Sequence, residues 1–459
     1  MLVPILTRYL TPYDYGVTAT ATVIVQVLTM LVGLNAYGLI AREQFTASQE
    51  SQSGLISASL GLAAILSGIV FLFFTMGGGI VGRLTEFPSS WVWMLAVFGF
   101  AQVLQSTTLG LVQSRMEPVR YGVYQLSDSA LNLGFSILLV VGWGMDWRGR
   151  MLALLVAALG MSALYFRELT SRLHLLRWRM EKTAVQQLIQ FGFPLIPHSI
   201  GGWVMTMSPR LFLNHLANVA DTGLYSVAFN LTCPMSMVMG AATRAYVPAL
   251  FQKLAEWEAV KRERSAVSPS GRGFAGASGQ QSAGSGSDSS PLSSPVPAVE
   301  RLSSVALAKG DRASSVERGK VRFCRLLLLV AAALLVGAVL LYLGIRWILP
   351  WLVGPKFQAA APYVFWLALA FAFQGIYFIF GSFVVYSKKT SLMAWRADFL
   401  GAIVTLALCP LLVLKMGPVG AAVTSAVAQA VSTIGCITAA LQAYPMPWKE
   451  AFGRVSRQE

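Results

Sequence analysis

Long apolar stretches alternate with short polar segments along almost the whole chain. Most of the stretches contain about 20 residues or more, which is what a helix needs to cross about 30 Å of hydrocarbon. Eleven of them occur, at residues 17–40, 54–80, 91–113, 121–143, 150–166, 188–214, 223–250, 325–349, 361–386, 394–414 and 418–443. The pattern predicts an all-α polytopic membrane protein.

The first ten residues, MLVPILTRYL, are also apolar, but they are only about half as long as a span requires. We expect them to be the last turns of a further helix whose beginning is missing, followed by a turn at Pro12. They lack the small-residue cleavage site of a signal peptide.

Two motifs recur, which indicates an internal repeat. Asp14-Tyr15-Gly16 resembles Asp221-Thr222-Gly223 at an offset of 207 residues, and each is expected to be a turn between two spans. The run WVWMLA at 91–96 resembles YVFWLA at 363–368 at an offset of 272. The repeat predicts two lobes of six helices, counting the shortened first helix. Because six is even, both lobes enter the membrane in the same sense, and we expect a pseudo-twofold axis along the membrane normal.

The second motif recurs at a larger offset (272) than the first (207), which predicts an insertion in the second half of the chain, at residues 251–324. Its Ser/Gly/Pro-rich centre buries too little apolar surface to fold, so we expect a disordered linker. It is either a solvated tether with a basic rim beside the membrane or a regulatory, partner-binding segment. The predicted organisation is an N-terminal lobe (1–166), a basic cytoplasmic inter-lobe loop (167–187), two helices of the C-terminal lobe (188–250), the disordered cytoplasmic insertion (251–324), four further helices (325–444) and a cytoplasmic tail (445–459).

Composition and charge agree with a membrane protein. The chain is 55% hydrophobic and 12% charged, with a mean hydropathy of +0.61, which excludes a water-soluble globule. The net charge of +15 lies in the loops and forms no nucleic-acid-binding face. One set of loops holds 26 Lys or Arg and the opposite set seven, among them Arg148 and Arg150. The positive-inside rule therefore places the first set and the C-terminus in the cytoplasm.

Motifs of enzymes and metal sites are absent. The three histidines form no cluster with cysteines, there is no phosphate-binding loop or nucleophile elbow, and the four cysteines show no paired spacing. The external loops, of about a dozen residues, are too short for the active site of a sugar polymerase. We expect no catalytic activity, metal or cofactor.

Ionisable residues within the predicted spans are the candidates for function, because a charge in hydrocarbon is costly and persists mainly where it faces a cavity or a partner. They are Arg210, Arg244, Asp128 and Asp398, the two aspartates lying at equivalent repeat positions. The structural alternative is that the arginines extend to headgroups and the aspartates cap helices or pair with neighbours such as Arg396.

Arg210 stands out, because Pro194, Pro197 and two glycines interrupt its helix and free backbone groups that need a polar cavity. His198 follows Pro197 in this broken helix. It is positioned either to bind an anionic headgroup, to change protonation during transport, or simply to pack.

Several segments occur in a recognisable order: LTRYLTPYDYG, FGFPLIPHSIGGWVMTMSPRLFLNHLANVADTGLYSVAFNL, LVGPKFQAAAPYVFWLALAFAFQGIY, YSKKT and GPVGAAVTSAVAQ. Together they resemble the Wzx-type polysaccharide flippases of the multidrug/oligosaccharidyl-lipid/polysaccharide exporter superfamily. The resemblance implies twelve helices in two lobes around a cationic cavity. It also implies transport of polyprenyl-diphosphate-linked oligosaccharides across a bacterial inner membrane. Pro209 departs from the family, which commonly has Asp there.

From this resemblance we expect a flippase that works by alternating access for surface polysaccharide, whether O-antigen of lipopolysaccharide, capsule or exopolysaccharide. Arg210, Arg244 and His198 are predicted to bind the diphosphate, and Asp128 and Asp398 to couple transport to an ion. The expected partners are membrane lipids and glycosyltransferases or a polymerase of the same pathway. The alternatives are a cation-coupled multidrug antiporter of the same superfamily and a membrane glycosyltransferase or polymerase.

Overall fold

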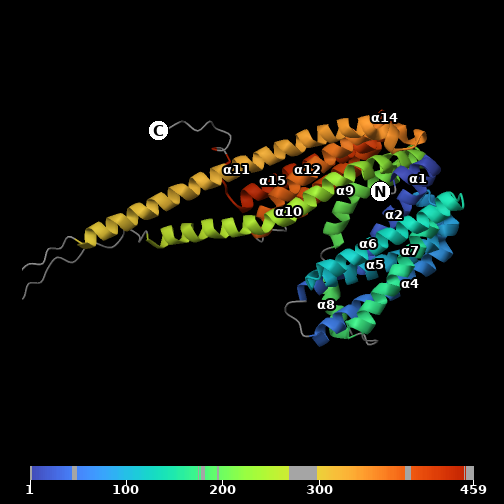
Figure 1. Ribbon diagram of the computed structural model, residues 1–459, viewed down its shortest axis with the longest axis horizontal. Helices are drawn as coiled ribbons and strands as arrows, with labels where there is room; N and C mark the ends of the chain where they lie inside the picture. The colour runs from blue at the N-terminus through green and yellow to red at the C-terminus, as the bar shows by residue number, and fades with distance from the viewer. Residues whose placement is uncertain are drawn as a thin grey trace, which may run out of the picture.

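The computed structural model describes residues 3–43, 49–173, 175–176, 181–193, 196–267, 297–387, 394–448 and 450. The described residues form helices and connecting turns, with no strand among them. Figure 1 shows two helical lobes that meet at the end carrying α1 and separate toward α8. The all-α fold is therefore confirmed.

The N-terminal lobe contains the first six long or shortened helices in chain order. They are α1 (Val3–Tyr9), α2 (Pro12–Gly33), α4 (Gln49–Thr85), α5 (Val92–Ser114), α6 (Pro118–Ser136) with its continuation η2 (Ile137–Gly142), and α7 (Trp147–Arg167) with η3 (Glu168–Arg172). Two shorter helices, α3 (Ala36–Glu43) and α8 (Lys182–Gly192), pack against α4, and η1 (Ser89–Trp91) precedes α5.

The C-terminal lobe also contains six helices. They are α9 (Ile196–Leu216), α10 (Val219–Val267), α11 (Pro297–Leu352), α12 (Ala361–Tyr386), α14 (Leu400–Met416), which η6 (Ala394–Phe399) precedes, and α15 (Val419–Ala443). The short η5 (Pro355–Ala360) joins α11 to α12. The core of this lobe forms where α12 and α15 pack together and where α10 and α14 cover them.

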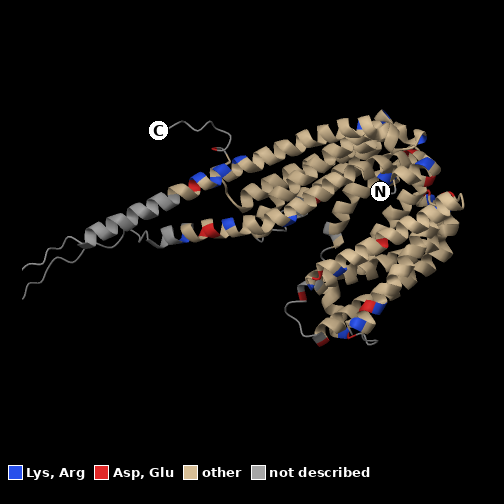
Figure 2. Cartoon of the chain, viewed as in Figure 1, with Lys and Arg blue, Asp and Glu red and all other residues tan. Residues whose placement is uncertain are grey.

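Nine of the described helical segments are long and apolar enough to cross a membrane. The predicted span at 188–214 is wrong as one continuous helix, because its first residues end α8 and the rest form α9, while the span at 223–250 lies within α10. Helices α9 and α10 are not apolar enough to qualify as spans on composition. Figure 2 shows charged residues mainly at helix ends and on the extension of α10 and α11, as expected for helices surrounded by lipid. The chain is a multi-pass membrane protein.

The start of α2 differs from the prediction, which placed a turn at Asp14–Gly16. Instead, Thr11 caps the helix, because its backbone N and Oγ1 donate to Asp14 Oδ2 at 2.8 and 2.6 Å and its Oγ1 accepts from Asp14 N at 3.2 Å. Pro12 occupies the first helical turn, where it needs no hydrogen-bond donor. The DYG motif therefore lies within the helix.

The predicted span at 17–40 is also wrong as one continuous helix. Leu34 and Asn35 adopt φ of 46° and 50°, which ends α2 and starts the separate helix α3. The sequence gives little warning, because neither residue is a glycine.

Helices α2 and α10 cross in very close contact at the two repeated motifs. A Cβ atom on Gly16 would lie 1.9 Å from the Val219 carbonyl oxygen, and one on Gly223 would lie 1.9 Å from the Pro12 carbonyl oxygen. Pro12 and Val219 are themselves separated by the repeat offset of 207 residues. This reciprocal contact is what a twofold axis passing between the two glycines produces.

The expectation that residues 251–324 are disordered is wrong at both ends of this segment. Helix α10 continues to Val267 and α11 begins at Pro297. Phe323 of α11 stacks on Tyr246 and meets Trp257 edge-on, with ring centroids 6.3 and 5.7 Å apart. Both ends are rich in Ala, Leu, Glu, Lys and Arg, which favour helix. The Ser/Gly/Pro-rich centre lies outside the described residues.

The glycine contact gives a first prediction. Gly223→Ala forces α2 and α10 apart, and overpacking of this kind costs about 1–3 kcal/mol or more. We expect a lower midpoint of thermal unfolding in detergent, measured by size-exclusion chromatography of heated samples. Gly240→Ala on the same helix is the matched control, because a Cβ there meets nothing within 4 Å. Equal midpoints for the two variants would contradict the close crossing.

Candidate functional site

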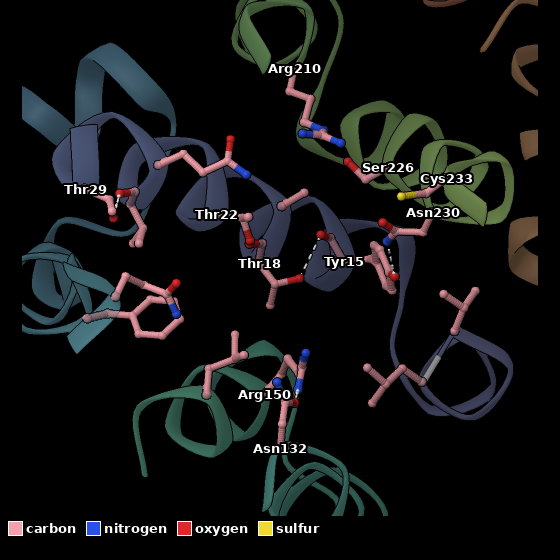
Figure 3. Close-up of a pocket in the computed structure, with 18 of the residues that line it drawn as sticks. Tyr15, Thr18, Thr22, Thr29, Asn132, Arg150, Arg210, Ser226, Asn230 and Cys233 are labelled. Atoms are coloured by element: carbon pink, nitrogen blue, oxygen red, sulfur yellow. Dashed lines mark hydrogen bonds between the residues drawn. The ribbon is translucent and has the colours of Figure 1, made fainter. Parts of the chain in front are cut away.

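A cavity of about 910 Å³ lies between the lobes. Helices α1, α2, α5, α6 and α7 line it from the N-terminal lobe, and α9 and α10 line it from the C-terminal lobe. Figure 3 shows Arg210 on one side of the pocket and Arg150 on the other, with Tyr15, Thr18 and Thr22 of α2 between them. The cavity thus lies where a two-lobed transporter would hold its substrate.

Arg210 is a buried cation without an acidic partner. Its side chain is 5% exposed, and its guanidinium carbon lies 4.4 Å from the ring centroid of Phe229 and 5.8 Å from that of Tyr225. Within the described part of the chain it forms no salt bridge, and its buried Nε has no hydrogen-bond partner. The aromatic rings compensate only part of the cost of desolvating a charge, so the site favours an anion.

Arg150 is the second cation of the cavity, and the sequence analysis missed it by counting it among loop residues. Asp146 caps α7 by accepting a hydrogen bond from the backbone N of Arg148, so the helix starts at Trp147. Arg150 therefore lies in the first turn of α7, where it lines the cavity. The Arg150 guanidinium donates to Asn132 Oδ1 at 2.6 Å and to Ser136 Oγ. The Asp-Trp-Arg sequence before Arg150 is a helix-start signal that would have revealed its position.

Tyr15 links the two arginines and the two lobes. Its hydroxyl accepts a hydrogen bond from Asn230 Nδ2 of α10 at 2.9 Å, and it lines the same cavity as Arg150 and Arg210 (Figure 3). Among the described residues lining the cavity, these two arginines carry charge and no Asp or Glu is present. Such a lining attracts phosphate-like groups, because arginine offers several fixed donors to them.

Of the other residues predicted to bind the diphosphate, Arg244 lies away from this cavity. Arg244 is exposed on α10 and does not line it. His198 falls in the first turn of α9, and its side chain is outside what the structure describes. The predicted roles of these two residues in binding diphosphate stay predictions.

The two aspartates occupy separate lobes. Asp128 of α6 is half-buried beside Gln105 of α5 and Tyr165 of α7. Asp398 in η6 is buried and accepts a hydrogen bond from the Tyr377 hydroxyl at 3.0 Å. Neither lines the cavity, and their predicted role in ion coupling stays a prediction. No group of three or more His, Cys, Asp or Glu among the described residues is arranged to hold a metal ion.

Residues 1–253 match the family described as polysaccharide biosynthesis protein. The chain belongs to this family. Among curated relatives, the succinoglycan biosynthesis transport protein ExoT of Rhizobium meliloti is 24% identical over 56% of the chain and 51% of its own length. An uncharacterised membrane protein of Haemophilus influenzae is 24% identical over 55% of the chain and 61% of its own length. The matches thus span between about half and two thirds of these relatives.

Solved structures of two transporters share the fold over most of the chain. An inward-facing multidrug resistance MATE family transporter of the MOP superfamily has a TM-score of 0.61 at 11% identity, covering 94% of this chain and 91% of the other. The lipid II flippase MurJ in an inward closed conformation has a TM-score of 0.57 at 10% identity, covering 97% and 85%. At this identity the likeness establishes the fold alone.

The unpaired charge of Arg210 gives a second prediction. Arg210→Met removes a buried cation while keeping most of its apolar volume, and so removes a desolvation penalty of several kcal/mol. We expect a higher thermal midpoint for the unliganded protein. Arg150→Met is the comparison, because it leaves Asn132 and Ser136 without their donor and should not stabilise. A lower midpoint for Arg210→Met would show that a partner pairs with its charge.

Proposed function

We propose that this protein moves a lipid-linked oligosaccharide, joined to its polyprenyl carrier through a diphosphate, from the inner to the outer leaflet of a bacterial inner membrane. The observation that carries the proposal is the pair of arginines in the acid-free cavity, one contributed by each lobe. A diphosphate has enough oxygens to accept hydrogen bonds from both guanidinium groups. The polysaccharide biosynthesis family and the name of the relative ExoT support a saccharide substrate.

Binding of one anion to both lobes suits alternating access. Arg150 belongs to the N-terminal lobe and Arg210 to the C-terminal lobe, so a bound diphosphate connects the two. When the lobes rock, the charged group crosses with the cavity while its lipid tail stays in the bilayer. Arg210 is buried and Arg150 is partly buried, so a diphosphate between them is kept from hydrocarbon, which is the main barrier to unassisted crossing.

A cation-coupled multidrug antiporter is the alternative that shares this fold. A cationic drug requires acidic or electron-rich groups, and the charged residues lining the described cavity are arginines. A glycosyltransferase or polymerase would require acid and base groups beside its substrate, and the same lining offers no carboxylate or histidine. The electrostatics of the cavity therefore favour transport of an anion.

Transport in reconstituted vesicles tests the proposal. Vesicles would contain undecaprenyl diphosphate carrying a fluorescent oligosaccharide, and the rate at which it becomes accessible on the opposite leaflet would be measured. We expect Arg210→Ala and Arg150→Ala each to slow translocation by about tenfold or more, since a hydrogen bond to a charged group contributes about 1.5–3 kcal/mol.

Arg148→Ala is the matched control, because Arg148 lies two residues from Arg150 but is exposed. It should transport at nearly the wild-type rate. Arg244→Ala tests the remaining arginine in the same assay, and slowing there would add Arg244 to the site. If both cavity arginines can be replaced without slowing, the proposed function is wrong.

A further inference from the structure

We propose that the cavity contains a separate saccharide subsite, formed by Thr22, Gln26 and Thr29 of α2 and Gln102 of α5. This inference rests on the proposed function and assigns its substrate a position and a direction. The four residues line the cavity together with the arginines, but they are polar and uncharged. Neutral sugars, which are rich in hydroxyl groups, are the ligand class that matches them.

The three α2 residues share one face of the helix, because they are spaced four and three positions apart. Thr22 donates its hydroxyl hydrogen to the Thr18 carbonyl at 3.0 Å, and Thr29 donates to the Val25 carbonyl at 2.8 Å. Their donors are thus used within the helix, while the oxygen lone pairs remain free to accept. Sugar hydroxyls are suitable donors for them.

The two glutamines supply the complementary groups. Within the described part of the chain neither Gln26 nor Gln102 forms a side-chain hydrogen bond, although both line the cavity. An amide offers two donors and an acceptor, which pairs well with vicinal hydroxyls. An alkyl chain in the same place would leave these amides without partners, at a cost of about 1–3 kcal/mol each. Phe98 of α5 adds an aromatic surface for the apolar face of a sugar ring.

The subsite extends along α2 away from the arginines. Figure 3 shows Thr18 and Thr22 between Arg150 and Arg210, and Thr29 farther along the helix. At about 1.5 Å per residue, Thr29 lies roughly 10 Å beyond Thr22. Helix α2 runs from the end where the lobes meet toward the end where they separate (Figure 1). The diphosphate therefore binds deep, near the closed end, and the saccharide extends toward the open end.

Two probes separate this subsite from the anion site. One is undecaprenyl diphosphate, and the other is undecaprenyl diphosphate carrying a neutral oligosaccharide. Affinity of the purified protein in nanodiscs would be measured for each. We expect the double variant Gln26→Leu, Gln102→Leu to weaken binding of the oligosaccharide-bearing probe by about tenfold or more, while the sugar-free probe binds within about twofold of wild type. Arg210→Ala should weaken binding of both.

Gln113→Leu, an exposed position on α5, is the matched control, and thermal midpoints identify variants that fail to fold. If the double glutamine variant weakens both probes equally, or neither, the saccharide subsite is wrong. If Arg210→Ala leaves both affinities unchanged, or wild type binds neither probe, the proposed function itself fails. The two failures are thus distinguishable.

A second proposal rests on contacts at the closed end. We infer that two equivalent latches hold the lobes together there, each joining the first helix of one lobe to the end of the third helix of the other. In the first latch, Arg8 of α1 donates to the Trp351 carbonyl at 3.3 Å, and Thr7 Oγ1 accepts from Gly354 N at 3.2 Å.

The second latch repeats this arrangement, and its residues in the first helix lie at an offset of 207 from those of the first latch. Asn214 of α9 donates to the Thr85 carbonyl at 2.9 Å and to Thr20 Oγ1 at 2.8 Å, and His215 Nε2 lies 2.7 Å from the Leu84 carbonyl oxygen. Thr7 and Asn214 are equivalent positions, as are Arg8 and His215. Both latches must open before the cavity can reach this side of the membrane.

Spin labels at Ser89 and Lys356, both exposed and next to the two latches, would measure this opening by double electron–electron resonance after replacement of the native cysteines. We expect the double variant Thr7→Val, Asn214→Ala to increase the long-distance population by about threefold or more, since each lost hydrogen bond contributes about 0.5–1.5 kcal/mol. Thr75→Ala, whose hydroxyl bonds within its own helix, is the control. Superimposable distributions for wild type and the double variant would overturn the proposal.

Discussion

The close crossing of α2 and α10 at Gly16 and Gly223 is the contact on which the arrangement of the two lobes depends. Without side chains at these positions, each helix backbone reaches a carbonyl of the other, and no larger residue fits. The contact aligns Tyr15 with Asn230 across the interface. It thereby places arginines from two different lobes around one cavity, which neither lobe could form alone.

The cavity is built at a cost in stability. An unpaired guanidinium buried against Phe229 and Tyr225 lowers the stability of the empty protein. The same feature supports the proposed anion site, because the described lining of the cavity holds no carboxylate that would have to be displaced first. Pro209, which stands where flippases of the resembling type commonly carry Asp, fits this arrangement: the neighbouring position supplies no competing acid.

The proposed substrate combines a saccharide with a diphosphate, and the cavity offers groups of a different kind for each. Guanidinium groups near the closed end suit charge, whereas threonine and glutamine side chains along α2 suit hydroxyl groups. The latches at the closed end join the lobes through a few hydrogen bonds that are readily exchanged for water. Breaking these hydrogen bonds is the step that the proposed alternating access requires at this end.

The sequence by itself determined the membrane class and most of the helices, pointed to a two-lobed repeat and singled out Arg210 as a candidate, because hydrophobic length and the cost of an intramembrane charge are local properties of the chain. It also pointed to the repeated glycine motifs but placed them in turns rather than within helices. Only the tertiary structure decided that Arg150 joins Arg210 in the cavity while Arg244 is exposed. Likewise, both ends of the segment 251–324, which was expected to be disordered, form helix. There Phe323 packs on Tyr246 and Trp257. Which face of a helix meets the cavity depends on where that helix begins and what it packs against, and those are contacts between residues far apart in the chain.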